Sequence, residues 1–312
     1  MRRLLASAAL ALALSAVPAA AADTLTVLLD WFVNPDHAPL LVARDKGMFA
    51  AEGLDVALIA PADPSAPPRL VAAGQGDVAV SYQPQLELAV KEGLPIVRFA
   101  TLVETPLNTV MALDGGPVKT LADLKGKKIG YSVAGFEDAV LGTMLESAGV
   151  KLSEVTLINV NFALTAALVS GQVDAVVGGF RNFEATELEL AGKKGLAFFP
   201  EEHGVPAYDE LIYVAAKAKI ADPRLPRFVA AVEKATLWMV NHPGEAWEVV
   251  KRSDAKLADE LNRRAFFDTL PRFAKRPGAL DVGRTERLAA FLKGRGLIET
   301  VRPVGDYAVS LK

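Results

Sequence analysis

The chain has 312 residues, of which 51% are hydrophobic and 23% charged, a composition typical of globular proteins rather than of disordered or fibrous chains. Its net charge of −3 gives no electrostatic reason to expect nucleic acid or an anionic lipid surface as a partner. Cysteine is absent, which excludes disulfide bonds, thiolate metal sites and a lipid-modified N-terminal cysteine.

Residues 1–22 have the pattern of a cleavable signal peptide. Arg2 and Arg3 precede an apolar run over residues 4–17, and the segment ends in small residues, with cleavage expected after Ala22. The apolar run is shorter than the ~20 residues that a membrane-spanning helix needs. We therefore expect an exported, soluble protein of the bacterial periplasm that is not a lipoprotein.

The remainder predicts two related α/β units. Two segments, VAAGQGDVAVSYQ at residues 71–83 and LVSGQVDAVVGGF at residues 168–180, share a helix end, a Gly-Gln pair and a strand led by aspartate. Each half also has an opening strand, at residues 25–30 and 127–133. Alternating strands and helices favour mostly parallel sheets, so the fold class is α/β.

Ligands of such sheets bind beyond the carboxyl ends of the strands. The loops after Asp30, Val80, Gly130 and Val177 are therefore the candidate binding loops, and two facing sheets would place all four in one cleft. From Arg224 onward the pattern changes to successive amphipathic helices without a strand between them.

Five motifs occur in order along nearly the whole chain: LDWFVNPDHAPL, GMFAAEGLDV, GQGDVAVSY, TLADLKGKKIGYSV and GGFRNFE. With them the chain resembles the periplasmic substrate-binding proteins of ABC importers, and most closely the branch that binds thiamine-precursor pyrimidines. That branch is related to the thiamine-pyrimidine synthase family of fungi. GMFAAEGLDV and TLADLKGKK also occur in relatives that bind sulfonates, nitrate or nitriles.

The resemblance implies a two-lobed periplasmic-binding-protein fold of the venus-flytrap type (type II) with C-terminal helices. Lobe 1 would comprise residues 23–110 and 214–312, lobe 2 residues 111–213, and the hinges would lie near 109–113 and 211–215. It also implies a monomer without a cofactor. Its partners would be an aminopyrimidine-like small molecule and an ABC permease of the inner membrane.

In the first half, Trp31 directly follows a strand, where its ring could stack on a planar heterocycle. Asn34 and His37 could form hydrogen bonds with the polar edge of that ring, and Tyr82 could supply a second aromatic face or a hydroxyl group. The alternative for Trp31 and Tyr82 is a structural position in the core or at an interface, and His37 also has a structural role as its alternative. We expect Phe32 to lie in the core and Asp36 to cap the helix that begins near Ala38.

In the second half, the segment from Ser132 to Gly135 could present backbone N–H groups to a polar ligand group at a helix start. Phe136 could close over the ligand ring. Glu137 and Asp138 are expected to complement the helix dipole in the first turn rather than to bind ligand.

Asn182 and Glu184 follow the strand at residues 173–177. A carboxylate accepts hydrogen bonds from an exocyclic amine or a ring N–H, so Glu184 is the expected specificity anchor; its alternative is a solvated position at a helix start. Arg181 is the sole cation of the four loops. Binders of nitrate or sulfonate need several donors or positive groups, so a neutral or amino-bearing ring is the expected ligand class.

Two other functions stay open: binding of a sulfonate, a nitrile or another small heterocycle, and a synthase-like enzyme. In the fungal synthases a histidine of the corresponding motif is consumed, alongside iron and a cysteine-rich motif that this chain lacks. The sequence contains no G-x-S-x-G, H-E-x-x-H or G-K-[ST] motif. We therefore expect hinge closure around a ligand, with no catalytic or metal-binding residue.

Overall fold

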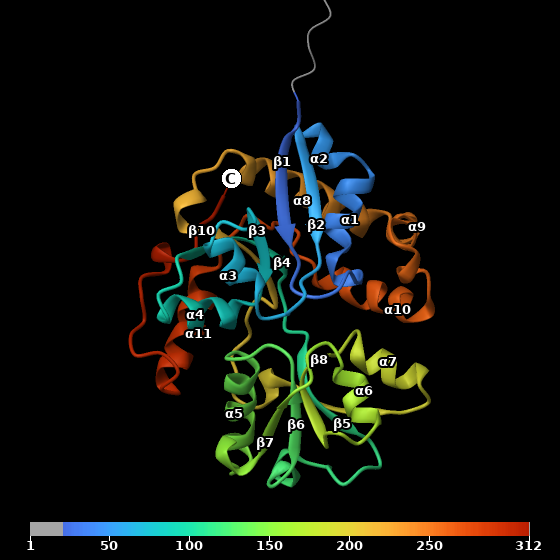
Figure 1. Cartoon of the computed structure of the whole chain (residues 1–312), viewed down its shortest axis with the longest axis vertical. Helices are drawn as coiled ribbons and strands as arrows, with labels where there is room; N and C mark the ends of the chain where they lie inside the picture. Colours follow the sequence, from blue (N-terminus) through green and yellow to red (C-terminus); the bar gives the residue numbers. More distant parts are fainter. Residues whose placement is uncertain (1–20, 312) are drawn as a thin grey trace, which may run out of the picture.

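The computed structural model describes residues 21–311, which form two α/β units, one above the other in Figure 1. Each unit is built around a five-stranded sheet. The first sheet has the order β2-β1-β3-β10-β4, with β1 (Asp23–Leu28), β2 (Leu54–Ile59), β3 (Val78–Ser81), β4 (Ile96–Val103) and β10 (Leu211–Ala216). The second has the order β7-β6-β8-β5-β9, with β5 (Asn108–Leu113), β6 (Lys128–Tyr131), β7 (Thr156–Asn159), β8 (Ala175–Phe180) and β9 (Gly195–Phe198).

The two sheets repeat one design. In each, a single strand, β10 or β5, runs antiparallel to both of its neighbours, whereas the strands of the β2-β1-β3 and β7-β6-β8 series pair in parallel. The two repeated aspartates also make equivalent hydrogen bonds. Asp77 Oδ2 accepts from the N–H of Thr26, and Asp174 Oδ2 accepts from the N–H of Lys128, both at 2.9 Å. The prediction of two related α/β units is confirmed.

The chain passes between the sheets twice, at residues 104–107 and at residues 199–210. The two passages are held together by Glu210, whose Oε2 accepts hydrogen bonds from the N–H groups of Leu107 at 2.5 Å and Asn108 at 2.9 Å. The ranges expected as hinges, 109–113 and 211–215, lie inside β5 and β10. The predicted lobe boundaries are close to these passages and stay a prediction.

Helices cover the sheets (Figure 1). The chain segments of the first sheet carry η1 (Pro35–His37), α1 (Ala38–Asp45), α2 (Met48–Ala51), α3 (Pro67–Ala72), α4 (Gln83–Lys91), α8 (Arg224–Asn241), α9 (Pro243–Ser253), α10 (Glu260–Thr269) and α11 (Val282–Gly294). Those of the second carry α5 (Glu137–Ser147), α6 (Leu164–Val169) and α7 (Glu184–Leu190). The predicted helical tail after Arg224 is confirmed.

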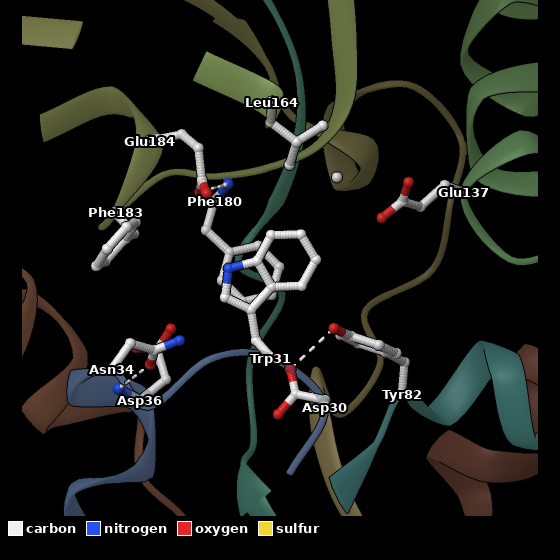
Figure 2. A pocket seen from close by; sticks show the side chains of 11 residues that line it. Asp30, Trp31, Asn34, Asp36, Tyr82, Glu137, Leu164, Phe180, Phe183 and Glu184 are labelled. Carbon is white, nitrogen blue, oxygen red and sulfur yellow. Dashed lines mark hydrogen bonds between the residues drawn. The ribbon is translucent and has the colours of Figure 1, made fainter. Parts of the chain in front are cut away.

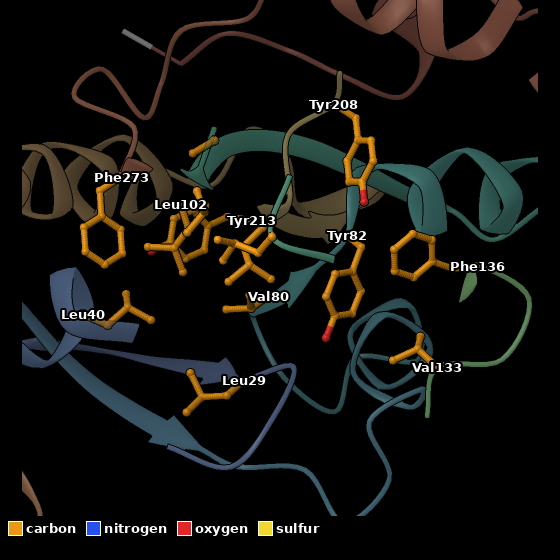
Figure 3. Close-up of a cluster of buried hydrophobic side chains, with 14 of the residues drawn as sticks. Leu29, Leu40, Val80, Tyr82, Leu102, Val133, Phe136, Tyr208, Tyr213 and Phe273 are labelled. Carbon is orange, nitrogen blue, oxygen red and sulfur yellow. The ribbon is translucent and has the colours of Figure 1, made fainter. Parts of the chain in front are cut away.

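Buried apolar side chains join the two units. In the first unit Phe228 of α8 stacks on Phe49 with ring centroids 5.5 Å apart and meets the edge of Tyr213 at 5.1 Å. Figure 3 shows the same cluster reaching Tyr82 at the end of β3 and Phe136 of the second unit. The rings of Tyr82 and Phe136 stack with centroids 5.1 Å apart, so the units are packed against each other beside the cleft between them.

Within residues 21–311, none of the helices has the length and apolar character needed to cross a membrane. All but the last two residues of the predicted signal peptide lie outside the described residues.

Candidate functional site

A cavity lies between the two units, at the carboxyl ends of their strands (Figure 2). It encloses about 380 Å³ of space not filled by protein atoms, including the part that opens to solvent. Its lining is formed by Asp30, Trp31, Asn34, Asp36, Tyr82, Glu137, Leu164, Gly178, Phe180, Phe183 and Glu184. Most of these residues end β8 or follow β1, β3, β6 or β8, which is where an α/β sheet is expected to bind a ligand.

Aromatic side chains from both units form the apolar walls. Trp31 is 8% exposed, and its ring meets the edge of Phe162 from the second unit with centroids 4.6 Å apart. Phe32, expected in the core, is instead 40% exposed and lies 5.9 Å from the ring of Phe183. The prediction for Phe32 was therefore wrong, although Trp31 and Asn34 close to it in the chain are buried.

Asp30, which lines the cavity, is held by hydrogen bonds from two directions. The hydroxyl of Tyr82 donates to its Oδ2 at 2.8 Å, and Nε2 of His37 lies 2.9 Å from its Oδ1. Because Nδ1 of His37 accepts from the N–H of Asn34 at 3.3 Å, Nε2 carries the proton and donates to Asp30. His37 is fully buried and does not line the cavity, contrary to expectation, so its role in the structure is to position Asp30.

Asp36 also differs from its prediction. Asn34 is the residue that caps the following turn, since its Oδ1 accepts from the N–H of Asp36 at 2.8 Å. The carboxyl group of Asp36 lines the cavity and accepts hydrogen bonds from Asn182 Nδ2 and Thr269 Oγ1, each at 2.7 Å. Burial raises the pKa of Asp36 to about 6.

These hydrogen bonds join the two units next to the cavity. Asn182 belongs to the second unit, whereas Asp36 and Thr269 belong to the first, and Asn182 Nδ2 also donates to Thr269 Oγ1 at 2.6 Å. Asn182 was expected to bind ligand. It lies behind the cavity wall instead and is not among the lining residues. We call Asp36, Asn182 and Thr269 the interunit triad.

Two glutamates of the second unit lie in the cavity almost fully buried. Glu184 begins α7 and is 7% exposed, and its Oε2 accepts from the N–H of Phe180 at 2.7 Å. Glu137 begins α5 and is 3% exposed, and its Oε2 accepts from the N–H of Ser132 at 2.7 Å. Burial raises the pKa of each carboxyl group to about 8. Glu137 was expected only to complement the helix dipole, so its position in the cavity is a correction.

Three further residues expected to bind ligand lie elsewhere. Ser132 is buried, and its hydroxyl donates to the carbonyl oxygen of Asn161. Gly135 is exposed beside a separate surface depression, which Phe136 also lines while its ring packs on Tyr82. The segment from Ser132 to Gly135 thus presents no donor to the cavity between the units.

The cavity is acidic and holds no positive group. Of its eleven lining residues four carry carboxyl groups and none is a cation. Arg181 is instead paired with Glu201 at 2.6 Å and lies over the ring of Phe199. No group of three or more His, Asp or Glu side chains suited to a metal ion occurs in residues 21–311. An anionic ligand would find no positive charge here to compensate its own.

Comparison of the sequence with known proteins identifies several relatives of this chain. A family model described as NMT1/THI5 like matches residues 34–246. The chain is 49% identical to a Haemophilus influenzae protein named for thiamine biosynthesis, over 95% of both chains. It is 40% identical to the formylaminopyrimidine-binding protein of Halalkalibacterium halodurans, over 74% of this chain and 70% of that protein. A 4-amino-5-hydroxymethyl-2-methylpyrimidine phosphate synthase of Legionella pneumophila is 26% identical over 80% of both chains.

Among solved structures, the alkanesulfonate-binding protein of Xanthomonas axonopodis pv. citri superposes with a TM-score of 0.72. The match covers 93% of this chain and 99% of that one at 15% sequence identity. At this identity the likeness concerns the fold alone, and it confirms the predicted two-lobed periplasmic-binding-protein fold.

Proposed function

The chain belongs to the NMT1/THI5-like family, and from this premise we propose that it is the solute-binding component of an ABC importer for a thiamine-precursor pyrimidine. The ligand would be of the hydroxymethylpyrimidine or formylaminopyrimidine type. The name of the Halalkalibacterium halodurans relative supports this ligand class. The role implies export to the periplasm and a permease partner in the inner membrane.

One observation carries the ligand class: an aromatic cavity with four carboxyl groups and no cation. An aminopyrimidine offers an amine that donates hydrogen bonds, ring nitrogens that accept them, and two flat faces. Trp31 and Tyr82 supply aromatic rings for the faces, and Glu184 supplies a hydrogen-bonding group for an edge. A sulfonate or nitrate would bring a negative charge that no lining residue balances.

Hinge closure is the proposed mechanism, because the cavity walls come from both units. A ligand shifts the equilibrium between open and closed forms only by its differential affinity for them, so contacts with both units are required. Trp31 and Tyr82 belong to the first unit and Glu137 and Glu184 to the second. The passages at residues 104–107 and 199–210 would provide the hinge.

A synthase-like enzyme is the second candidate, because the Legionella pneumophila relative carries a synthase name. In the resemblance that chemistry consumes a histidine, which here would be His37. That side chain is fully buried and hydrogen-bonded on both ring nitrogens, behind Asp30. The buried position supports binding over synthesis.

The test is a thermal-shift screen of purified protein lacking residues 1–22, followed by titration calorimetry. The compounds are hydroxymethylpyrimidine, formylaminopyrimidine, the pyrimidine phosphate, thiamine and a series of alkanesulfonates. Ligand at 100 times its Kd stabilises the native state by ~2.7 kcal/mol, so a melting shift is expected for the uncharged aminopyrimidines. A shift confined to sulfonates would overturn the ligand class, and turnover of any pyrimidine would overturn the binding role.

A further inference from the structure

Glu137 has no assigned role in the proposed function, yet it is more deeply buried than Glu184. Glu137 is 3% exposed and lines the cavity, and its Oε2 accepts a hydrogen bond from the N–H of Ser132. A structural acid in the first turn of a helix normally points to solvent, where water stabilises its charge. A carboxyl group buried at the cavity is therefore unusual for a purely structural acid, and it is in position to contact a ligand.

The backbone opposite Glu137 is shaped around its carboxyl group. Gly178 of β8 has a φ of +92°, in the left-handed region, and any Cβ at this position would overlap the Glu137 carboxyl. Only glycine therefore allows the carboxyl group to occupy its place. In Figure 2 the carboxyl groups of Glu137 and Glu184 point into the cavity from opposite sides of the Trp31 ring.

The surroundings favour the uncharged form of Glu137. The ionisable groups that act on it are the acids Glu184 of α7 and Glu210 of the second passage, and the nearby Tyr82 hydroxyl is neutral. Burial is the main effect, and with these acids it raises the pKa of Glu137 despite the backbone hydrogen bonds from Ser132 and Val133, which lower it. A protonated carboxyl group donates one hydrogen bond through O–H and accepts others through C=O.

Such a group is complementary to an aminopyrimidine edge. Its O–H can donate to a ring nitrogen while its carbonyl oxygen accepts from the neighbouring amine. With two carboxyl groups on opposite sides of the cavity, both polar edges of one ring can be bound at once, the amine-bearing edge by one glutamate and the remaining ring nitrogen by the other.

We propose that Glu137 is a second specificity-determining residue of this site, which binds the ring edge opposite to Glu184. The inference rests on the proposed function, because it takes the ligand to be an aminopyrimidine. It adds a contact that distinguishes a ring with two polar edges from a ring with one.

The experiment is titration calorimetry with hydroxymethylpyrimidine at pH 7 on the wild type, Glu137→Gln, Glu137→Ala and Asp138→Asn. Glutamine keeps one donor and one acceptor in the same place, so Glu137→Gln should bind within about threefold of the wild type. Glu137→Ala removes both groups and should weaken binding at least tenfold. Asp138→Asn is the matched control, since it removes an acid from the same helical turn outside the cavity lining.

The outcomes distinguish a failure of the Glu137 proposal from a failure of the proposed function. Equal affinity of Glu137→Ala and the wild type would overturn the contact, while a loss in Glu137→Gln as large as in Glu137→Ala would overturn the uncharged state. Absence of binding by the wild type itself would instead overturn the proposed ligand class. Thermal melting of every variant establishes that the protein is folded.

Discussion

Gly178 shows how one backbone position determines the shape of the cavity. Its left-handed conformation and its contact with the Glu137 carboxyl leave no room for a side chain. We expect Gly178→Ala to weaken aminopyrimidine binding at least tenfold, because the added methyl group must displace Glu137 and strain the backbone. Gly179→Ala is the control, since a Cβ there would meet its neighbours at ordinary contact distances of 3.5 Å or more. Calorimetric titration of both variants checks this, and equal affinities would contradict it.

The buried carboxyl groups predict how stability changes with pH. Glu137 and Glu184 have pKa values of about 8 in the folded protein and an ordinary value of 4.5. Between pH 4.5 and 8 the unfolded chain loses these protons while the folded protein keeps them. The free energy of unfolding therefore falls as pH rises through this window, by up to ~1.4 kcal/mol per pH unit for each group. Glu87 and Glu210, with pKa values of about 7, act in the same direction.

We expect the Tm of the ligand-free protein to fall by at least ~5 °C between pH 5 and 8. The double variant Glu137→Gln, Glu184→Gln should show a clearly smaller decrease, because two of the groups responsible are gone. Calorimetric melts in matched buffers provide the measurement. A wild type whose Tm is constant over this range, or equal slopes for both proteins, would rule out the proposed ionisation states.

How far the sequence predicts the site can be judged residue by residue. Trp31, Asn34, Tyr82 and Glu184 follow strands, and the rule that strand ends bind ligands brings all four to the cavity lining. The same rule could have identified Asp30. Glu137 was missed because an acid in a first helical turn is normally explained by the helix dipole, and only the folded chain places it against Gly178. His37 and Asn182 are polar and correctly located along the chain, but their hydrogen bonds to other residues place them behind the wall.

At the scale of elements, the end of α10 is coupled to the loop after β8 by the interunit triad. Thr269 is fully buried, accepts from Asn182 and donates to Asp36. Thr269→Val keeps the shape but removes the hydroxyl, so it should lower the free energy of unfolding by ~1–2 kcal/mol. Thr269→Ser keeps the hydroxyl and is the matched control. Urea denaturation compares the two, and equal losses would attribute the effect to packing instead.

Sequence patterns located the elements better than their pairing. The strands at residues 25–30 and 127–133 were predicted from apolar runs, and the structure has β1 and β6 there. Which sheet a strand joins is not encoded in such a pattern. The resemblance implies a hinge near residues 109–113, and this range lies in β5, whose pairing partners in β8 and β9 lie more than 60 residues further along the chain.

At the scale of the whole molecule, the two units are joined by two passages and by contacts across the cleft, so ligand binding should change the overall dimensions. We expect small-angle X-ray scattering to give a smaller radius of gyration with saturating aminopyrimidine than without it. The interunit triad should contribute to this closure, so Asn182→Ala should show a smaller change. A radius of gyration unaffected by ligand in the wild type would contradict hinge closure.

The place of β10 in the first sheet has a consequence for the order of folding. This strand lies between β3 and β4, although more than 100 residues separate it from β4 along the chain. During synthesis, the strands of the second sheet emerge as one uninterrupted stretch of chain. The first sheet stays incomplete until β10 has been synthesised. We therefore expect nascent chains that end before Leu211 to protect β6 and β8 from hydrogen exchange before β3 and β4. Two sheets of the same design would then mature at different times, because only one of them has all its strands in a single stretch of chain.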